Sequence, residues 1–560
     1  MIQETAESDR TLTYLTSRVE LFDQVQDWCD EAGLSSRKLP SFHSDCETAK
    51  GEHGTEWEQK VRNQYHSFGL LPKEIHREAE CLFGEQLPCT REGNCGYLAN
   101  QDYDPEEYDV LVGHYVHAHV PKNVDGRHVV FDEFPEGAFR SEYDAGTWKE
   151  AISSLLNQHD DIRFSYPKEL RAVQQGSSDE RDVLQWLEPL YGIVGRDARG
   201  AINSPAGGAH PRAPAMANAL LAAEDVGNHW MHAQLLDGRP AVIDPSNEEL
   251  TVLDRPDLDE AQGVLALDGT PTVEKWELLL GNDLHHQSLM SGSEKANFLR
   301  NELGIQVVQT TTAANHYSGR SGISLTEELD MVLFEAVSNR EEVQPVLIST
   351  NSALEAYQEE GVAEYVSDCA NYGGIKGSNE FSATRVGIVA GSPHYGDPYI
   401  KKWAALAKES ASRKKDTDGV EQDFGPFGNQ ILQGMRESEV LQALLRFGRD
   451  GRGATVYVHT GAIPDWVELE EPVPDVRQWS DGMLEVIDAI KALPIPEWRT
   501  KELAEEVSIS TRQVRTHLNS LEELGYVGHR TVGRGKTWFA KNIDQSGRGH
   551  VHFKTSNDSG

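Results

Sequence analysis

Two adjacent carboxylates, Asp132 and Glu133, stand at the carboxyl end of the apolar run in GRHVVFDEFPE (Gly126 to Glu136). The run predicts a buried strand, and open α/β sheets bind ligands at that end of their strands. In a nucleoside triphosphatase the first carboxylate would hold Mg²⁺, and the second would orient or deprotonate the attacking water. The alternative is an acidic pair that only caps a strand in an acidic protein.

Two arginines have a spacing suited to phosphate chemistry. The segment LQALLRFGRDGRG (Leu441 to Gly453) contains Gln442, Arg446 and Arg449. On a helix, residues three and four apart share a face, so both guanidiniums could point into a cleft between domains. There they would stabilise charge on a transferring phosphoryl group, as arginine fingers do. The alternative is an exposed basic helix face.

Four of the six cysteines cluster in one stretch of the chain, at Cys46, Cys81, Cys89 and Cys95. Four thiolates can hold either a [4Fe-4S] cluster or a structural Zn²⁺. The intervals of 34, 7 and 5 residues lack the CxxC pairs of a zinc ribbon. This spacing favours the cluster over zinc as the bound metal group, and free cysteines are the third possibility.

Short apolar runs are expected to position these residues. Because they alternate with helical stretches, they predict parallel sheets covered by helices on both faces. A chain of 560 residues is too long for one core, so we predict an α/β fold with two such sheets and a smaller domain. The predicted strands are Leu12 to Thr16, Val129 to Phe131, Val346 to Ser349, Val386 to Ala390 and Ala454 to Val458.

The chain carries 91 acidic and 52 basic residues, a net charge of -39, yet its 38% apolar residues can build cores. Such charge resembles that of haloarchaeal proteins, in which molar salt cuts the Debye length to about 3 Å. The charge therefore does not exclude a nucleic-acid partner. No apolar run approaches the roughly 18 residues of a membrane span. We expect a soluble, cytoplasmic protein without a membrane partner.

Residues 484 to 543 predict a winged helix-turn-helix domain. Ser510 and Gln513 have capping-box spacing at the start of the second predicted helix. The segment HRTVGRGKTWFAK (His529 to Lys541) predicts a β-hairpin around a glycine-rich turn. The side chains expected to contact DNA are Arg512, Arg515, Thr516, Asn519, Arg530, Arg534 and Lys536.

The predicted winged helix reverses the charge of the chain. From Trp498 to Lys541 there are eight basic and five acidic side chains, a net charge of +3 within a chain of -39. This reversal favours contact with DNA. A winged helix that docks another protein is the alternative.

Several segments follow one another in the order of helicase motifs Ia to VI, and the acidic pair stands in the place of a DEAH-type motif II. The chain thus resembles the superfamily 2 DNA helicases of the XPD-like, iron-sulfur class over about residues 11 to 465. The segments are TLTYLTSRVELFDQ (Thr11 to Gln24), VVFDEFP, LDGTPT (Leu267 to Thr272), PVLISTNSALEAY (Pro345 to Tyr357), Gly373 to Trp403, and the Gln442, Arg446, Arg449 pattern.

The resemblance implies two RecA-like lobes, at residues 1–285 and 286–480. The first would carry a cysteine-rich insertion at about 43–100 and a helical insertion at about 141–260, and the polar tail 544–560 is expected to be disordered. The implied cofactors are ATP, Mg²⁺ and an iron-sulfur cluster on the four cysteines. The implied partner is DNA, single-stranded across the lobes and duplex at the winged helix.

A Walker A loop, GxxxxGK[ST], should precede motif Ia, but only ten residues stand before Thr11. The GKT at Gly535 to Thr537 lies in the predicted hairpin and has Arg530 where the first glycine is required, so it is not a phosphate loop. Three explanations stay open, in order of preference: a true start upstream, a separate chain that supplies the loop, or a core that has lost ATP hydrolysis.

We therefore interpret the chain as a helicase-like DNA-binding protein, the motor of an ATP-dependent DNA helicase or translocase truncated before its Walker A loop. Its ATP hydrolase activity is implied by the resemblance alone. The alternative is a non-catalytic DNA-binding protein, such as a transcription or plasmid-maintenance factor, with a degenerate helicase core.

Overall fold

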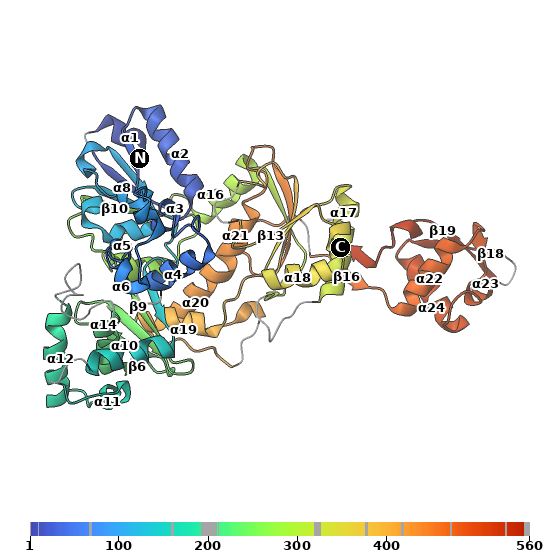
Figure 1. The fold of residues 1–560 in the computed structure, drawn as a ribbon. Coiled ribbons are helices and arrows are strands. Elements are labelled where there is room, and N and C mark those ends of the chain that lie inside the picture. The colour runs from blue at the N-terminus through green and yellow to red at the C-terminus, as the bar shows by residue number, and fades with distance from the viewer. Residues whose placement is uncertain are drawn as a thin grey trace. The chain divides into compact units, whose positions relative to one another are not determined.

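The computed structural model comprises two compact units (Figure 1). Unit 1 contains residues 1–286, 397–413 and 423–431, and unit 2 contains residues 287–396, 414–422 and 432–560. No helix in the described part of the chain is long and apolar enough to cross a membrane. The structure describes residues 2–8, 10–66, 70–157, 162–191, 210, 212–317, 326–375, 379–415, 419–470, 473–532 and 535–553.

Unit 1 is built on a parallel sheet with the strand order β10-β4-β1-β3-β2. Helix α2 (Val19–Ala32) covers one face of this sheet through Phe22 and Val25, while Tyr115 and Trp276 pack on the other face. The predicted parallel α/β lobe is confirmed. Its strands are β1 (Leu12–Leu15), β2 (Ser36–Lys38), β3 (Val110–Gly113), β4 (His128–Asp132) and β10 (Gly263–Leu267).

Unit 2 contains a second parallel sheet, with the order β11-β15-β14-β12-β13. Helices α17 (Glu327–Glu341) and α18 (Asn351–Glu359) share a core with one face, and α21 (Glu439–Leu444) shares a core with the other. The prediction of two parallel sheets is thus confirmed. The strands are β11 (Ile305–Gln309), β12 (Val346–Ser349), β13 (Asp368–Asn371), β14 (Val386–Ala390) and β15 (Ala454–His459).

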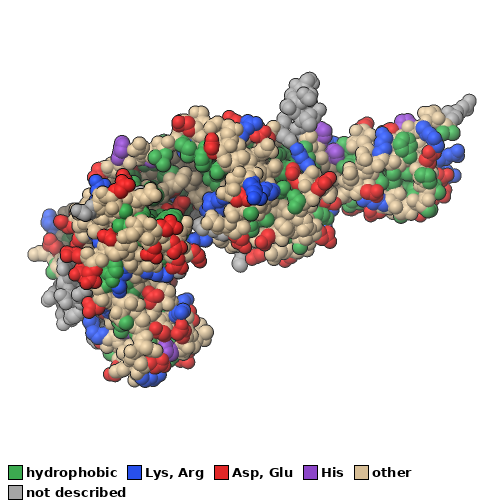
Figure 2. All heavy atoms as spheres, turned by 90° about the horizontal axis from the view of Figure 1, so that it is seen from above, with side chains coloured by type: hydrophobic (Ala, Val, Ile, Leu, Met, Phe, Trp, Pro, Cys, Tyr) green, Lys and Arg blue, Asp and Glu red, His purple; other side chains and the backbone are tan. Residues whose placement is uncertain are grey.

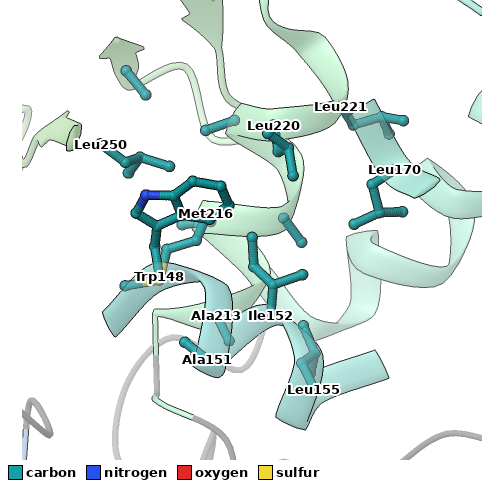
Figure 3. Close-up of a cluster of buried hydrophobic side chains, with 14 of the residues drawn as sticks. Trp148, Ala151, Ile152, Leu155, Leu170, Ala213, Met216, Leu220, Leu221 and Leu250 are labelled. Atoms are coloured by element: carbon teal, nitrogen blue, oxygen red, sulfur yellow. The ribbon is translucent and has the colours of Figure 1, made fainter. Parts of the chain in front are cut away.

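The insertion predicted as helical also contains an antiparallel sheet, β5-β9-β8-β7-β6, within unit 1. Strand β8 is buried at all five positions, so its apolar run fits a strand covered on both faces. Trp148 and Ile152 of α10 (Ala145–Asn157) face Met216 and Leu220 of α14 (Ala213–Ala222) in its core (Figure 3). The strands are β5 (Arg140–Tyr143), β6 (Glu224–Asp225), β7 (Met231–Gln234), β8 (Pro240–Asp244) and β9 (Glu249–Leu253).

The C-terminal module of unit 2 has its own core, in which Trp498 and Trp538 pack against Val514, Leu518 and Leu521. Its sheet, β17-β19-β18, is antiparallel. Its elements, in chain order, are α22 (Asp481–Ala492), β17 (Glu497–Trp498), α23 (Thr500–Ala504), α24 (Thr511–Glu523), β18 (Val527–Val532) and β19 (Gly535–Ala540).

The disorder predicted for the tail from residue 544 is wrong for residues 544–553. Strand β20 (Gly549–His552) pairs antiparallel with β16 (Asp475–Gln478). Tertiary packing explains this order, because Val551 and Phe553 pack against the core that contains α17. Residues 554–560 lie outside the described part of the chain.

The capping box predicted at the start of α24 is formed. The backbone N–H of Gln513 donates to Ser510 Oγ at 3.4 Å, and the N–H of Ser510 donates to Gln513 Oε1 at 3.1 Å. Loss of such a cap costs about 1 kcal/mol. We expect Ser510→Ala to speed hydrogen exchange of the first turn of α24 about fivefold, while Thr511→Ala, the control, leaves it unchanged. Equal exchange in both variants would show that the cap does not stabilise the helix.

Candidate metal centre and nucleic-acid interface

Three of the four predicted cysteines meet a histidine inside unit 1. The ligand atoms of Cys46, His76, Cys89 and Cys95 all lie within 4.8 Å of one another, and all four side chains are buried. His76 Nε2 is 3.5 Å from Cys46 Sγ, 3.7 Å from Cys89 Sγ and 3.3 Å from Cys95 Sγ. Because thiolates and imidazole are metal ligands, this group could hold a metal ion.

Four short helices position these ligands. Cys46 follows α3 (Phe42–Asp45) and Cys95 precedes α8 (Gly96–Ala99). His76 lies on α5 (Pro72–Arg77), and Cys89 lies on α7 (Pro88–Arg91). Isolated helices shorter than about 12 residues are marginal in water. The positions of the four ligands therefore depend on contacts between the helices.

Cys81 lies outside this group. Its side chain is exposed on α6 (Ala79–Phe83), which follows directly after α5. The clustering of cysteines in the sequence predicted Cys81 as a ligand and did not indicate His76, because no CxxC or HxxxH spacing marks a histidine at that position. Only the packing of α5 beside α7 and α8 brings the imidazole to the three sulfurs.

The acidic pair stands where the sequence placed it, at the carboxyl end of a parallel strand. Asp132 is the last residue of β4, and Glu133 follows in the left-handed region with a φ of 68°. Burial raises the pKa of Asp132, although hydroxyls of Tyr14 and Thr16 at the end of β1 donate hydrogen bonds to it. The hydroxyl of Tyr115 donates to the Asp132 carbonyl. A non-glycine residue with positive φ needs a surrounding structure that holds it, as functional sites often provide.

The raised pKa of Asp132 predicts that this side chain makes the stability of the fold depend on pH. A carboxyl whose pKa is raised by folding destabilises the fold when it ionises. The stabilising contribution of the protonated carboxyl is therefore complete below the unfolded pKa and is lost as pH rises through the folded pKa. Asp132→Asn should therefore raise the Tm at pH 7, by about 2 °C, with the difference vanishing in acid. The exposed Asp125→Asn is the control. A Tm gain that is the same at every pH would contradict this explanation.

The predicted arginine face does not form on a helix. Helix α21 ends at Leu444, so Gln442 is helical whereas Arg446, which is buried, and Arg449, which is exposed, lie beyond the helix. Phe447 lies between the two arginines, and its ring fills the space beside Gly387 of β14, so that a side chain at Gly387 would clash with it. The Nη1 group of Arg449 donates a hydrogen bond to Asn379 Oδ1 at 3.3 Å.

The basic side chains of the C-terminal module lie on α24 and the β18–β19 hairpin. Arg512, Arg515 and Thr516 of α24 are exposed, and Asn519 is partly exposed. Lys536 Nζ lies 3.4 Å from Asn519 Oδ1, so the hairpin lysine stands beside the helix. Arg530 pairs with Glu497, and Arg534 lies outside the described residues. Figure 2 shows Lys and Arg side chains on the visible face of this module.

Comparison with known proteins gives a distant likeness only. No protein-family model and no curated protein matches the chain. Among solved structures it is similar to the "Structure of S. tokodaii Xpd4", with 10% sequence identity and a TM-score of 0.35 over 82% of this chain and 90% of that chain.

Proposed function

We propose that the chain is a helicase-like DNA-binding protein whose C-terminal module is a winged helix that binds duplex DNA. The observation that carries this proposal is the exposed face of α24. Arg512 and Arg515 are exposed there, and neither has an ion-pair partner among the described residues. In a chain of net charge -39, two basic side chains without neighbouring carboxylate partners favour an anionic ligand.

The position of the β18–β19 hairpin supports the proposal that DNA binds at α24. Lys536 Nζ lies 3.4 Å from Asn519 Oδ1 and 3.6 Å from a carboxylate oxygen of Glu522. A helix in the major groove would bring Asn519 to base edges and Lys536 to a phosphate. Arg530 is expected to contribute less, because it pairs more closely with Glu497 than Lys536 does with Glu522.

The proposal is tested by fluorescence anisotropy of a labelled DNA duplex with the full-length chain, across a KCl series and with or without ATP and Mg²⁺. We expect binding without ATP that weakens steeply as KCl rises. No binding at any KCl concentration would contradict DNA recognition and leave protein docking as the use of the module. Deletion of residues 484–560 is unsuitable here, because it would also remove β20 from its pairing with β16.

An ATP-driven DNA motor is the second candidate, favoured by Asp132 and Glu133 at the carboxyl end of β4. Carboxylates at that place suit a Mg²⁺-nucleotide, with Asp132 as a ligand of the cation and Glu133 as the residue that orients water. The sequence shows no Walker A loop between a strand and a helix. This candidate therefore requires a phosphate-binding loop from another polypeptide segment.

The motor is tested by DNA-stimulated ATP hydrolysis in molar KCl. We expect Glu133→Gln to lower the rate by about 100-fold or more, because the variant cannot accept a proton from water. Glu106→Gln, at an exposed position outside the acidic pair, is the matched control. Equal background rates in all proteins would reject the motor and leave the non-catalytic DNA-binding function.

A further inference from the structure

We propose that Cys46, His76, Cys89 and Cys95 bind one tetrahedral Zn²⁺, in place of the [4Fe-4S] cluster that the family resemblance implied. All four side chains are buried, at 0%, 8%, 0% and 6% exposure in that order. Their donors form a Cys₃His set, which is a common set for structural zinc.

The distances between the donors fit a single ion. Zinc binds sulfur at about 2.3 Å and imidazole nitrogen at about 2.0–2.1 Å, so tetrahedral geometry places two sulfurs about 3.8 Å apart and a sulfur and a nitrogen about 3.6 Å apart. Cys46 Sγ and Cys89 Sγ are 3.7 Å apart. The three distances from His76 Nε2 to the sulfurs are 3.3, 3.5 and 3.7 Å. These four distances match one coordination tetrahedron, and the other two sulfur–sulfur distances are within 4.8 Å.

Hydrogen bonds alone do not explain this convergence. His76 Nδ1 lies 2.6 Å from the carbonyl oxygen of Pro72, which makes Nδ1 the protonated nitrogen of the neutral ring. The remaining Nε2 has one lone pair and can accept one S–H donor. Three sulfurs nevertheless surround Nε2 at similar distances, as expected when all four atoms point to a common ion.

The same geometry excludes the cluster. In a [4Fe-4S] cluster each thiolate binds a different iron, so the body of the cluster holds the ligand sulfurs well apart. Here two sulfurs are 3.7 Å apart and leave room between them for one ion only. The fourth thiolate that a Cys₄ cluster would need, Cys81, is exposed and outside the group. The residues present therefore do not fit the cluster.

Contacts behind the ligands hold them in this arrangement. The carbonyl of Pro72 fixes the orientation of the His76 ring, as carbonyls behind metal-binding histidines do. The N–H of Cys89 donates to Thr48 Oγ1 at 3.2 Å. Beside Cys95, the N–H of Gly96 donates to Glu47 Oε1 at 3.1 Å. With four buried protein ligands and no position for water, the site is structural and not catalytic.

Metal identity is tested on the full-length chain, purified anaerobically from cells grown with both iron and zinc. Elemental analysis is expected to find about one zinc per chain and no acid-labile sulfide. Iron with labile sulfide would overturn the proposal in favour of the cluster. A fully folded chain with no bound metal, which takes up no added Zn²⁺, would overturn it in favour of a thiol network.

Two matched variants separate the ligand sets. His76→Ala is expected to lose most of the zinc, while Cys81→Ala keeps it all; the reverse result would support a Cys₄ site and contradict ours. Where His76→Ala does not fold, His76→Cys with Co²⁺ as the probe replaces it. The added thiolate should intensify the sulfur-to-cobalt charge-transfer absorption. Unchanged absorption would exclude His76 as a ligand.

Discussion

Removal of the metal ion is expected to unfold the cysteine-rich part of unit 1 while the two parallel sheets stay folded. Apparent binding free energies of structural zinc are about 10–16 kcal/mol, and this becomes folding free energy when no site exists in the unfolded chain. The helices that carry or flank the ligands have only four to six residues each and share a small apolar core. We expect a strong chelator to speed proteolysis within residues 42–100 at least tenfold, as measured by mass spectrometry.

Acid is expected to have the same effect on proteolysis as the chelator. Metal-binding thiolates and imidazole must be deprotonated, so acid releases the metal and accelerates the same cleavage. Added Zn²⁺ at neutral pH should restore resistance. Cys81→Ser is the control, because this exposed thiol lies outside the metal group, and its cleavage should match that of the unmodified chain. Cleavage within residues 42–100 that is indifferent to chelator would show that the apolar core alone maintains this segment.

The double variant Arg512→Ala, Arg515→Ala is expected to weaken duplex binding about 100-fold at fixed KCl, because each arginine contact is worth about 1–3 kcal/mol. Lys536→Ala should act differently. It removes a phosphate contact, so it should weaken binding to all sequences alike and reduce the slope of log affinity against log salt by about 0.9. Anisotropy titrations over several salt concentrations and two duplex sequences separate the two effects.

A control variant outside α24 tests for a general electrostatic effect. Arg477→Ala, on β16, removes one positive charge, as Lys536→Ala does, but this residue lies outside α24 and pairs with Asp475. Its affinity for the duplex should stay within about twofold of the unmodified chain. If the double variant binds as tightly as Arg477→Ala, the exposed face of α24 is not the DNA surface.

The sequence by itself determined the features that depend on local pattern. Apolar runs ending in polar residues predicted five strands of the two parallel sheets, because strands covered on both faces need such runs. The apolar run before Asp132 and Glu133 likewise predicted that this acidic pair lies at a strand end. Ser510 and Gln513 predicted the start of α24, because a capping box involves residues only three apart.

Only the tertiary structure decided which distant residues meet. His76 reaches three sulfurs through the packing of separate short helices. Cys81 is exposed and lies outside this group, although it is nearer to Cys89 in sequence than His76 is. Arg446 and Arg449 lie beyond the end of α21, and Phe447 between them packs beside Gly387, some sixty residues earlier. Strand β20 forms because it pairs antiparallel with β16. Each of these outcomes depends on contacts between residues far apart in the chain, which no local pattern of apolar, polar or capping residues encodes.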